Sequence, residues 1–422
     1  MIVSISKSEV SGRVRAPSSK SYTIRALMCA ALARGQSEII APLESDDTEA
    51  ASRVLGKIGV SIEQSGGPWR VSGGNFHKPD EDLFCGDSAA TLRFMTAVSA
   101  IVPGQCRLTA GPSLSKRPVK PLIEALKKLG VGCSSQNGLP PVTVEGGQFK
   151  GGETSLPGDI SSQFVSALLL IAPFAEKGMT IKLTTPLESK PYLSMTLDCM
   201  SKFGICVGFS EALDWFQAMK QEYQPCRYEV EGDWTSASYF LALGALSRGV
   251  RVENLNPSRS LQGDKVMLDF LRQMGANVDV TDNIVTVSRS ILKPIKADLT
   301  DCIDLLPTMT VLAAVAGGQS ELTGIARARL KESNRVKAVS EGLQRLGIKV
   351  KEAQDSLVIT GGKPQSAVID SYGDHRIAMA FSVLGVAFGG VTIEKAECVA
   401  KTFPQFWAIL ESIGGRLKID GQ

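Results

Sequence analysis

One pattern recurs six times along the 422-residue chain at nearly constant spacing. In each copy an apolar pattern typical of a helix ends at a glycine and passes into a strand-like run. The glycines are Gly59, Gly130, Gly204, Gly275, Gly347 and Gly414, separated by 71, 74, 71, 72 and 67 residues. A glycine directly after a helix favours the left-handed backbone conformation that ends it. The chain is therefore predicted to contain six copies of one unit of about 70 residues.

A second element keeps the same register: a helical segment rich in alanine that follows a polar or Gly-Asp turn. Its copies span residues 18–32, 86–100, 159–172, 232–246, 304–316 and 373–386. Small side chains in the middle of a helix favour close packing and burial. Helix–glycine–strand joints occur in many α/β proteins, but two elements in one register six times indicate a repeat. Six copies divide into three plus three, with a break in the pattern at 226–230.

Composition excludes several classes of protein. Lys plus Arg total 46, Asp plus Glu total 43 and aromatic residues make up 6%, which argues against a nucleic-acid binder. Two histidines, His77 and His375, are too few for a zinc site built from several histidines. The longest apolar run, 167–175, is too short to span a membrane. Nine cysteines without a Cys-x-x-Cys pair, and no apolar secretory segment at the N-terminus, predict a cytoplasmic protein with reduced thiols.

Lysines and arginines gather at the turns that begin the predicted helices. A cation is unfavourable at the positive end of a helix dipole, whereas an anion held by the free N–H groups is favoured there. For one such residue a solvated surface charge is the simpler explanation, but the cost recurs from copy to copy, which predicts a shared anionic ligand. The residues are Lys20, Lys116, Arg117, Lys190, Lys331, Arg335, Arg376 and Lys401.

Hydroxyl groups, an amide and three acids accompany these cations. A carboxylate among cations stays ionised and can act as a general base. A helix N-cap is the alternative role for each acid, and it fits Asp374 well. The hydroxyls and the amide suit phosphate, carboxylate and sugar-like groups. The acids are Asp304, Glu332 and Asp374, and the neutral groups are Ser19, Ser21, Ser161, Ser162, Gln163, Ser189 and Tyr192.

Several short motifs at these turns identify a family when they are taken together. They include Ser-Lys-Ser at 19–21 with Arg25, Lys-Glu-Ser-x-Arg at 331–335, Gly-Asp-His-Arg at 373–376 and Lys-Thr-Phe-Pro at 401–404. In order and spacing, from about residue 7 to 416, the chain resembles the 5-enolpyruvylshikimate-3-phosphate synthase family. The resemblance implies an α/β fold of two lobes, an inside-out α/β barrel of six βαβαββ copies with three in each lobe. In that family the N-terminal strand belongs to the C-terminal lobe, so we expect one lobe from 1–12 with 228–422 and the other from 13–227.

The same resemblance implies the reaction: transfer of the enolpyruvyl group of phosphoenolpyruvate to the 5-hydroxyl of shikimate 3-phosphate, with release of phosphate. It implies a monomer whose lobes close around the first substrate, and no metal ion or organic cofactor. Asp304 is the implied base, and Lys20 and Glu332 are the implied proton donors and shuttles. The implied shikimate 3-phosphate site comprises Lys20, Ser21, Arg25, Ser161, Ser162, Gln163, Ser189, Tyr192, Asp304 and Lys331. The implied phosphoenolpyruvate site comprises Lys20, Ala89, Arg93, Arg117, Gln163, Arg335, Arg376 and Lys401.

Three departures from the family pattern bear on function. Ala89 stands where the family normally has a glycine against the phosphoenolpyruvate pocket, and its methyl group should crowd the longer inhibitor glyphosate more than the substrate. We therefore expect reduced glyphosate sensitivity. Asp87 stands where asparagine is usual, and its charge near an anionic substrate is expected to raise the Michaelis constant. Asp301 remains the alternative to Asp304 as base, because this stretch is variable in the family.

Two other functions would also fit a chain with this repeat. A sister enolpyruvyl transferase that acts on UDP-N-acetylglucosamine carries a cysteine in the loop of the second copy. The corresponding loop here, 110–118, has none, and Cys106 lies upstream of it. A non-catalytic anion-binding protein on the same repeat would not need to keep an acid, a base and anion clamps together. Lys20, Asp304, Glu332, Arg376 and Lys401 therefore favour an enzyme.

Overall fold

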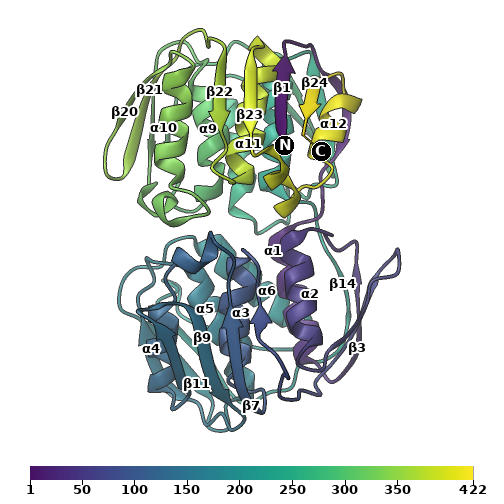
Figure 1. Cartoon of the computed structure of the whole chain (residues 1–422), viewed down its shortest axis with the longest axis vertical. Coiled ribbons are helices and arrows are strands. Elements are labelled where there is room, and N and C mark those ends of the chain that lie inside the picture. Colours follow the sequence, from purple (N-terminus) through teal and green to yellow (C-terminus); the bar gives the residue numbers. More distant parts are fainter. Residues whose placement is uncertain (422) are drawn as a thin grey trace. The chain divides into compact units, whose positions relative to one another are not determined.

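The computed structural model describes residues 1–421. The chain folds into two compact units: unit 1 comprises Met1–Pro17 with the chain from Glu231 onward, and unit 2 comprises Ser18–Val230. The chain passes between the units after Pro17 and after Val230, whereas the sequence placed these crossings after residues 12 and 227. Helices and strands carry the labels of Figure 1. No helix of the described part of the chain is long and apolar enough to cross a membrane.

Among residues 1–421 each unit contains three four-stranded sheets of one topology, in which a parallel pair at one edge is followed by two antiparallel pairings. The sheets of unit 2 are β14 (Arg227–Glu229), β3 (Gly35–Ile40), β5 (Trp69–Gly73), β4 (Ser61–Glu63); β6 (Leu83–Phe84), β7 (Gly104–Thr109), β9 (Leu139–Gly146), β8 (Gly132–Gln136); and β10 (Gly152–Leu156), β11 (Met179–Leu183), β13 (Trp215–Ala218), β12 (Gly208–Phe209). The sheets of unit 1 are β2 (Ser11–Arg15), β15 (Gly249–Glu253), β17 (Ile284–Ser288), β16 (Asn277–Thr281); β18 (Lys296–Asp298), β19 (Gln319–Thr323), β21 (Ser356–Thr360), β20 (Lys349–Glu352); and β22 (Ala367–Asp370), β23 (Val391–Glu394), β1 (Ile2–Ser6), β24 (Arg416–Asp420). These sheets correspond to the copies of the sequence repeat.

Two strands are exchanged where the chain passes between the units. β2 directly precedes the first helix of unit 2, yet it pairs in parallel with β15 of unit 1. β14 directly precedes the helix that opens the second half of unit 1, yet it pairs in parallel with β3 of unit 2. β2 thus completes a sheet whose other strands come from the second half of the sequence, and β14 completes a sheet whose other strands come from the first half.

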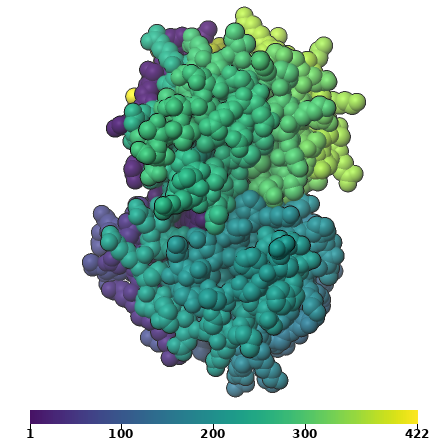
Figure 2. Space-filling model, turned by 180° about the vertical axis from the view of Figure 1, so that it is seen from behind, coloured from purple at the N-terminus to yellow at the C-terminus, as the bar shows by residue number. Residues whose placement is uncertain are grey.

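The N-terminal strand closes the last sheet of unit 1. β1 pairs antiparallel with both β23 and β24, so the two ends of the chain lie in one sheet (Figure 1). Figure 2 shows N-terminal residues, in purple, on the surface of the body that is otherwise formed by the second half of the chain. Val3 and Ile5 point into the core of this unit, with 0% and 2% of their surfaces exposed.

The alanine-rich helices form the centre of each unit, as the sequence predicted. Every residue of α3 and of α9 is buried, since small side chains let these helices pack closely against neighbours on all sides. Each unit has its own hydrophobic cluster. The central helices are α1 (Lys20–Leu32), α3 (Ala89–Val98) and α5 (Ser162–Ile171) in unit 2, and α7 (Trp234–Leu246), α9 (Leu306–Ala313) and α11 (His375–Phe388) in unit 1.

The second helix of each copy ends at the glycine that the sequence repeat singled out. These helices are α2 (Asp46–Gly56), α4 (Lys120–Lys128), α6 (Lys190–Lys202), α8 (Met267–Gln273), α10 (Arg335–Arg345) and α12 (Phe406–Ser412). All six glycines have positive φ, from 76° to 104°. After Gly130, for example, Val131 N donates to Leu126 O at 3.1 Å while Gly130 N donates to Lys127 O at 3.0 Å. The paired bonds cap the last carbonyls of the helix, which confirms the prediction of helix stops.

Candidate active site

The central helices of unit 2 begin at predicted site residues. Lys20 is the first residue of α1, Ala89 of α3 and Ser162 of α5. Each helix is preceded by a serine with extended backbone, and the Ser19 and Ser161 hydroxyls accept hydrogen bonds from N–H groups of the first turn. A side-chain oxygen at this position satisfies one N–H group of the first turn and leaves others for an anion.

Arg93 links α3 to the start of α5. Its Nη1 donates to Ser161 Oγ at 3.0 Å and to Gln163 Oε1 at 2.8 Å, and its guanidinium lies 4.7 Å from the centre of the Phe164 ring. The side chain is 4% exposed. Since the arginine is held on one side by these contacts, Arg93, Ser161 and Gln163 form one preorganised group of donors and acceptors.

Arg25 is a second buried arginine of unit 2, fixed on three sides. Its Nε donates to Thr196 Oγ1 at 2.8 Å, Nη1 to Ser21 O at 3.0 Å and Nη2 to Tyr192 O at 3.0 Å. Burial lowers the pKa of Arg25 from its ordinary value. A guanidinium has five N–H groups, so two remain beyond these three bonds for an anionic ligand. The structure thus places Arg25 next to the backbone carbonyls of Ser21 and Tyr192.

Lys20 has a partner that the sequence reasoning missed. Its Nζ lies 3.0 Å from Oδ2 of Asp47, a residue of the first turn of α2 that is 3% exposed. Asp47 lies in one of the polar helix-start turns, and this position was the signal available in the sequence. A buried carboxylate next to a lysine fixes the position of the ammonium group.

Two loops of unit 2 hold further predicted residues. Ser189 precedes α6 in a left-handed conformation (φ 55°, ψ 46°), and it is 3% exposed. Arg117 follows the 3-10 turn Leu114–Lys116 and is 8% exposed. Asp87 accepts hydrogen bonds from the N–H groups of Ser113 and Leu114 at 3.0 and 2.8 Å. Its charge therefore stabilises the loop that carries Arg117.

In unit 1 Arg335 lies at the centre of a cluster of three carboxylates. Its Nη1 lies 2.6 Å from Asp304 Oδ1, its Nη2 2.6 Å from Glu332 Oε2 and its Nε 2.8 Å from Asp374 Oδ2. The side chain is 1% exposed. Each side-chain nitrogen of Arg335 thus donates to a carboxylate, and the residue organises the acids. Nη2 also donates to Asp374 Oδ1 at 3.4 Å, so within residues 1–421 four of the five N–H groups of Arg335 are used by carboxylates and one, on Nη1, is not.

Asp304 also contacts two other cations. Lys331 Nζ lies 3.4 Å from its Oδ1, and Arg376 Nη2 lies 3.3 Å from its Oδ2. Asp304 belongs to the 3-10 turn η4 (Ile303–Leu305) and is 7% exposed. Burial lowers the pKa of Lys331 to about 8, although the charge of Asp304 opposes this shift. These contacts favour Asp304 over Asp301 as the carboxylate of the cluster.

Two further acids near this cluster, Asp374 and Asp264, are buried. Asp374 caps α11 by accepting from Arg376 N at 3.0 Å, and it also accepts from Ser333 Oγ at 3.0 Å. Its N-cap role and its contact with Arg335 therefore coexist. Asp264 is 3% exposed and accepts from Thr235 Oγ1. Burial, with the negative charge of Asp304 added, raises the pKa of Asp264 to about 7. Sequence reasoning missed this acid, although it lies in the turn at 261–265 that begins the fourth copy's second helix.

A family model described as EPSP synthase (3-phosphoshikimate 1-carboxyvinyltransferase) matches residues 5–410. The chain belongs to the EPSP synthase family. It is 50% identical over 421 residues to a 3-phosphoshikimate 1-carboxyvinyltransferase from Dehalococcoides mccartyi, covering 99% of each chain. A protein of that name from Methanothermobacter thermautotrophicus is 40% identical over 426 residues, covering 99% of this chain and 100% of the relative. The structure of an EPSP synthase from Acinetobacter baumannii matches at a TM-score of 0.82 and 28% identity, covering 99% of this chain and 100% of that chain.

The residues implied by EPSP synthase motifs divide between the two units. In unit 1, Arg335 contacts both Asp304 and Glu332. In unit 2, Arg93 and Arg25 belong to two separate groups of residues. Unit 2 holds Lys20, Ser21, Arg25, Ala89, Arg93, Arg117, Ser161, Ser162, Gln163, Ser189 and Tyr192. Unit 1 holds Asp304, Lys331, Glu332, Arg335, Arg376 and Lys401.

Proposed function

We propose that this EPSP synthase family member transfers the enolpyruvyl group of phosphoenolpyruvate to the 5-hydroxyl of shikimate 3-phosphate and releases phosphate. Family membership over residues 5–410 carries this conclusion. The reaction is a step of the shikimate pathway and of aromatic amino acid biosynthesis. Both substrates are phosphorylated carboxylates, which accounts for buried arginines at helix starts that no need of helix stability explains.

Unit 2 supplies the neutral and cationic groups for the sugar phosphate in this proposal. Arg25 offers two N–H groups, and Ser161 and Gln163 are held in place by Arg93. Ser162, Ser189, Tyr192, Ser21 and Lys20 complete the unit 2 part of the shikimate 3-phosphate site. Lys331 and Asp304 of unit 1 serve the same substrate. The arrangement suits a ligand with one phosphate, one carboxylate and several hydroxyls.

The phosphoenolpyruvate contacts are proposed for Lys20, Arg93, Arg117, Gln163, Arg335, Arg376 and Lys401, with the start of α3 at Ala89. Arginines that are already desolvated and oriented stabilise charge on the addition intermediate and on departing phosphate without reorganising. Arg93, Arg335 and Arg376 are 4%, 1% and 6% exposed, which meets this condition.

Proton transfer is assigned to the acids and to Lys20. Asp304, held by ion pairs with Lys331, Arg335 and Arg376, takes the proton of the substrate hydroxyl. Lys20, held in position by Asp47, and Glu332, held by Arg335, provide and shuttle the proton for the methylene carbon. The reaction in this scheme proceeds by addition and elimination through a tetrahedral intermediate, without a metal ion or organic cofactor.

The remaining details of this proposal concern the whole molecule. We take the six-copy α/β fold to form the inside-out barrel of two closing lobes, in a monomer that acts in the cytoplasm on small molecules rather than on nucleic acid or membranes. A molar mass near 44.9 kDa, measured in solution, is the result expected for a monomer.

The deciding experiment measures release of inorganic phosphate from phosphoenolpyruvate in the presence of shikimate 3-phosphate. Release should require both substrates and should yield the enolpyruvyl ether of shikimate 3-phosphate, identified by phosphorus NMR. UDP-N-acetylglucosamine in place of shikimate 3-phosphate should give no release. Release with the nucleotide sugar alone would assign the sister activity, and no release with either acceptor would favour a binding protein.

A further inference from the structure

Unit 2 has a pocket at the C-terminal ends of its central helices. This helix-end pocket has a volume of about 480 Å³ and is lined by residues at or just beyond the ends of α1, α3 and α5, including Leu32, Ile101 and Phe174. The active-site residues lie where the same helices begin. With a rise of 1.5 Å per residue, the 13 residues of α1 separate its two ends by about 20 Å. A ligand in the pocket therefore would not overlap the substrates.

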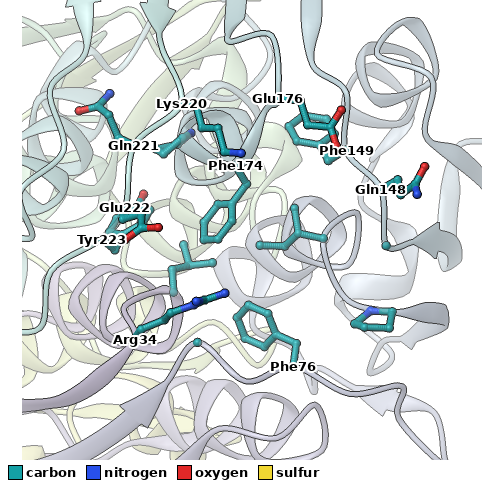
Figure 3. A pocket seen from close by; sticks show the side chains of 16 residues that line it. Arg34, Phe76, Gln148, Phe149, Phe174, Glu176, Lys220, Gln221, Glu222 and Tyr223 are labelled. Atoms are coloured by element: carbon teal, nitrogen blue, oxygen red, sulfur yellow. The ribbon is translucent and has the colours of Figure 1, made fainter.

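Aromatic side chains form one part of the pocket. Phe174 and Tyr223 are stacked, with ring centres 6.1 Å apart and planes inclined by 24°. The Tyr223 hydroxyl donates to Leu170 O at 2.9 Å, which fixes this pair at the end of α5. The ring of Phe76 lies on another side of the same cavity (Figure 3). Phe76 and Phe174 are both only partly buried, so each offers an open ring surface to a planar apolar group.

Two cations belong to the same pocket. Figure 3 shows the side chains of Arg34 and Lys220 pointing toward the region of the Phe76 and Phe174 rings. The carboxylates of Glu176 and Glu222 lie at its sides. Among residues 1–421 none of these four charged side chains forms an ion pair with another residue. The positive charges of Arg34 and Lys220 are thus open to a ligand.

At the equivalent end of unit 1, the corresponding arginine forms an ion pair. Leu-Ser-Arg-Gly at 246–249 repeats the Leu-Ala-Arg-Gly of 32–35, so Arg248 corresponds to Arg34. Arg248 Nε lies 2.5 Å from Glu9 Oε2, and Arg289 Nη2 lies 2.9 Å from the other oxygen of Glu9. Both arginines thus share the carboxylate of Glu9, so Arg248 has an ion-pair partner where Arg34 has none among residues 1–421. The two units have diverged at this place.

We propose that the helix-end pocket of unit 2 binds a small aromatic monocarboxylate. Its ring packs against Phe76 and Phe174, and its carboxylate accepts hydrogen bonds from Arg34 and Lys220. The volume is in the range of small-molecule sites. Glu176 and Glu222 at the sides of the pocket repel a second negative charge, so a phosphate or dicarboxylate fits less well. The site is separate from the reaction proposed above and does not depend on it.

The test uses 3-phenylpropanoate as the probe, followed by ligand-observed NMR with the full chain. The dissociation constant should be on the order of 1 mM or tighter, as is typical of a ligand with about a dozen non-hydrogen atoms. Two matched probes separate the contributions. 3-Phenylpropan-1-ol lacks the charge and hexanoate lacks the ring, and each should bind at least about tenfold more weakly. Saturating shikimate 3-phosphate should leave binding of 3-phenylpropanoate unchanged.

Variants locate the probe. Arg34→Gln and Lys220→Gln should each weaken binding of 3-phenylpropanoate about tenfold, which is the loss of one charge-assisted contact. Arg248→Gln, the matched change in unit 1, should leave it within about twofold. Glu222→Gln should leave it unchanged or tighten it, because a competing negative charge is removed. All four residues are on the surface and outside the candidate active site, so phosphate release should stay within about twofold in every variant.

Several results would overturn the proposal. These are the absence of binding at 10 mM probe, equal binding of the alcohol and the carboxylate, unchanged binding in Arg34→Gln, and displacement of the probe by shikimate 3-phosphate. The last would place the probe in the active site. Since these readouts concern binding alone, they stand whether or not the phosphate-release assay succeeds.

Discussion

At the scale of single residues, buried charge determines what the candidate site can do. Arg335 binds three carboxylates that come from a 3-10 turn, from its own helix start and from the start of α11. Placing so many charges out of water is costly unless each is paired, and removing one partner leaves the others uncompensated. The cluster therefore holds Asp304 in one position by ion pairs with Lys331, Arg335 and Arg376, and a fixed position is what a general base requires.

Asp304→Asn should lower kcat by about 100-fold or more, because the amide cannot take the proton of the substrate hydroxyl. Phosphate release under saturating substrates measures this. Asp301→Asn is the matched control, three residues away in the sequence, and should leave kcat within about twofold. If Asp304→Asn turns over within tenfold of the unmodified chain, Asp304 is not the base.

Lys331 should make activity fall at alkaline pH. Its pKa is lowered to about 8, so the ammonium is charged below pH 8 and neutral above it. The Michaelis constant for shikimate 3-phosphate should therefore rise as pH increases through about 8. In Lys331→Arg the side chain stays charged, so this rise of the Michaelis constant should shift to higher pH. Lys337→Arg, at an exposed position, should not shift it. A rise at unchanged pH in Lys331→Arg would exclude Lys331 as its cause.

Ala89 should set the response to glyphosate. It is the first residue of α3, 6% exposed and one turn before Arg93, so its methyl group faces the same region as that arginine. Ala89→Gly should lower the glyphosate concentration for half inhibition about tenfold or more, with a smaller change in the Michaelis constant for phosphoenolpyruvate. Inhibition of the unmodified chain at low micromolar glyphosate, unchanged in Ala89→Gly, would contradict this.

At the scale of elements, glycines serve two different purposes that the sequence does not distinguish. Gly130 ends α4 with φ of 83°, and a methyl group there would meet no atom within 4 Å. Gly146 at the end of β9 lies against the end of α3 instead. A methyl group there would overlap the carbonyl oxygens of Ser99 and Val102. Conformation explains the first glycine, and close approach of two backbones explains the second.

Gly130→Ala and Gly146→Ala should therefore differ in stability. The first imposes a left-handed alanine and should reduce the free energy of unfolding by about 1 kcal/mol. The second forces a strand away from a helix end and should reduce it several-fold more, since backbone atoms cannot move aside as side chains do. Urea unfolding followed by circular dichroism compares the two. Equal losses would show that the close approach carries no energetic weight.

At the scale of the whole molecule, the N-terminal strand ties the start of the chain to its end. β1 lies between β23 and β24, and within residues 1–421 no other strand joins those two. The exchange of β2 and β14 links the two halves of the sequence in a similar way. Contacts of this kind close very long loops, and for β1 the burial of Val3 and Ile5 offsets the entropic cost of closure.

Deletion of residues 1–6 should destabilise unit 1 and spare unit 2. Hydrogen exchange should show lost protection at Arg416–Asp420, which pairs only with β1 in this sheet, and a partial loss at Val391–Glu394, which stays paired with β22, while Ala89–Val98 in unit 2 keeps its protection. Ser4→Ala, which removes one hydroxyl contact with Thr392, is the control and should change little. Retained protection in β23 and β24 would mean that the sheet does not need β1.

Local features of the chain could be predicted from the sequence. The helix stops, the buried alanine-rich helices and the charged turns are written in neighbouring residues, because conformational preference and helix periodicity act over one or two turns. The motif residues could also be named in advance, and the structure places Arg93 with Ser161 and Gln163 and Asp304 with Lys331 and Arg376.

The sequence by itself thus determined the repeat, its helix ends and the residue types of the site. Only the tertiary structure decided that Asp47 holds Lys20, that Arg335 donates to three carboxylates, and that β1, β2 and β14 complete sheets far away in the chain. The physical reason is distance along the chain. Most of these partners lie 27 to several hundred residues apart, whereas the partners of Arg335 act only as a group. The burial that makes each pairing favourable exists only once the units have folded.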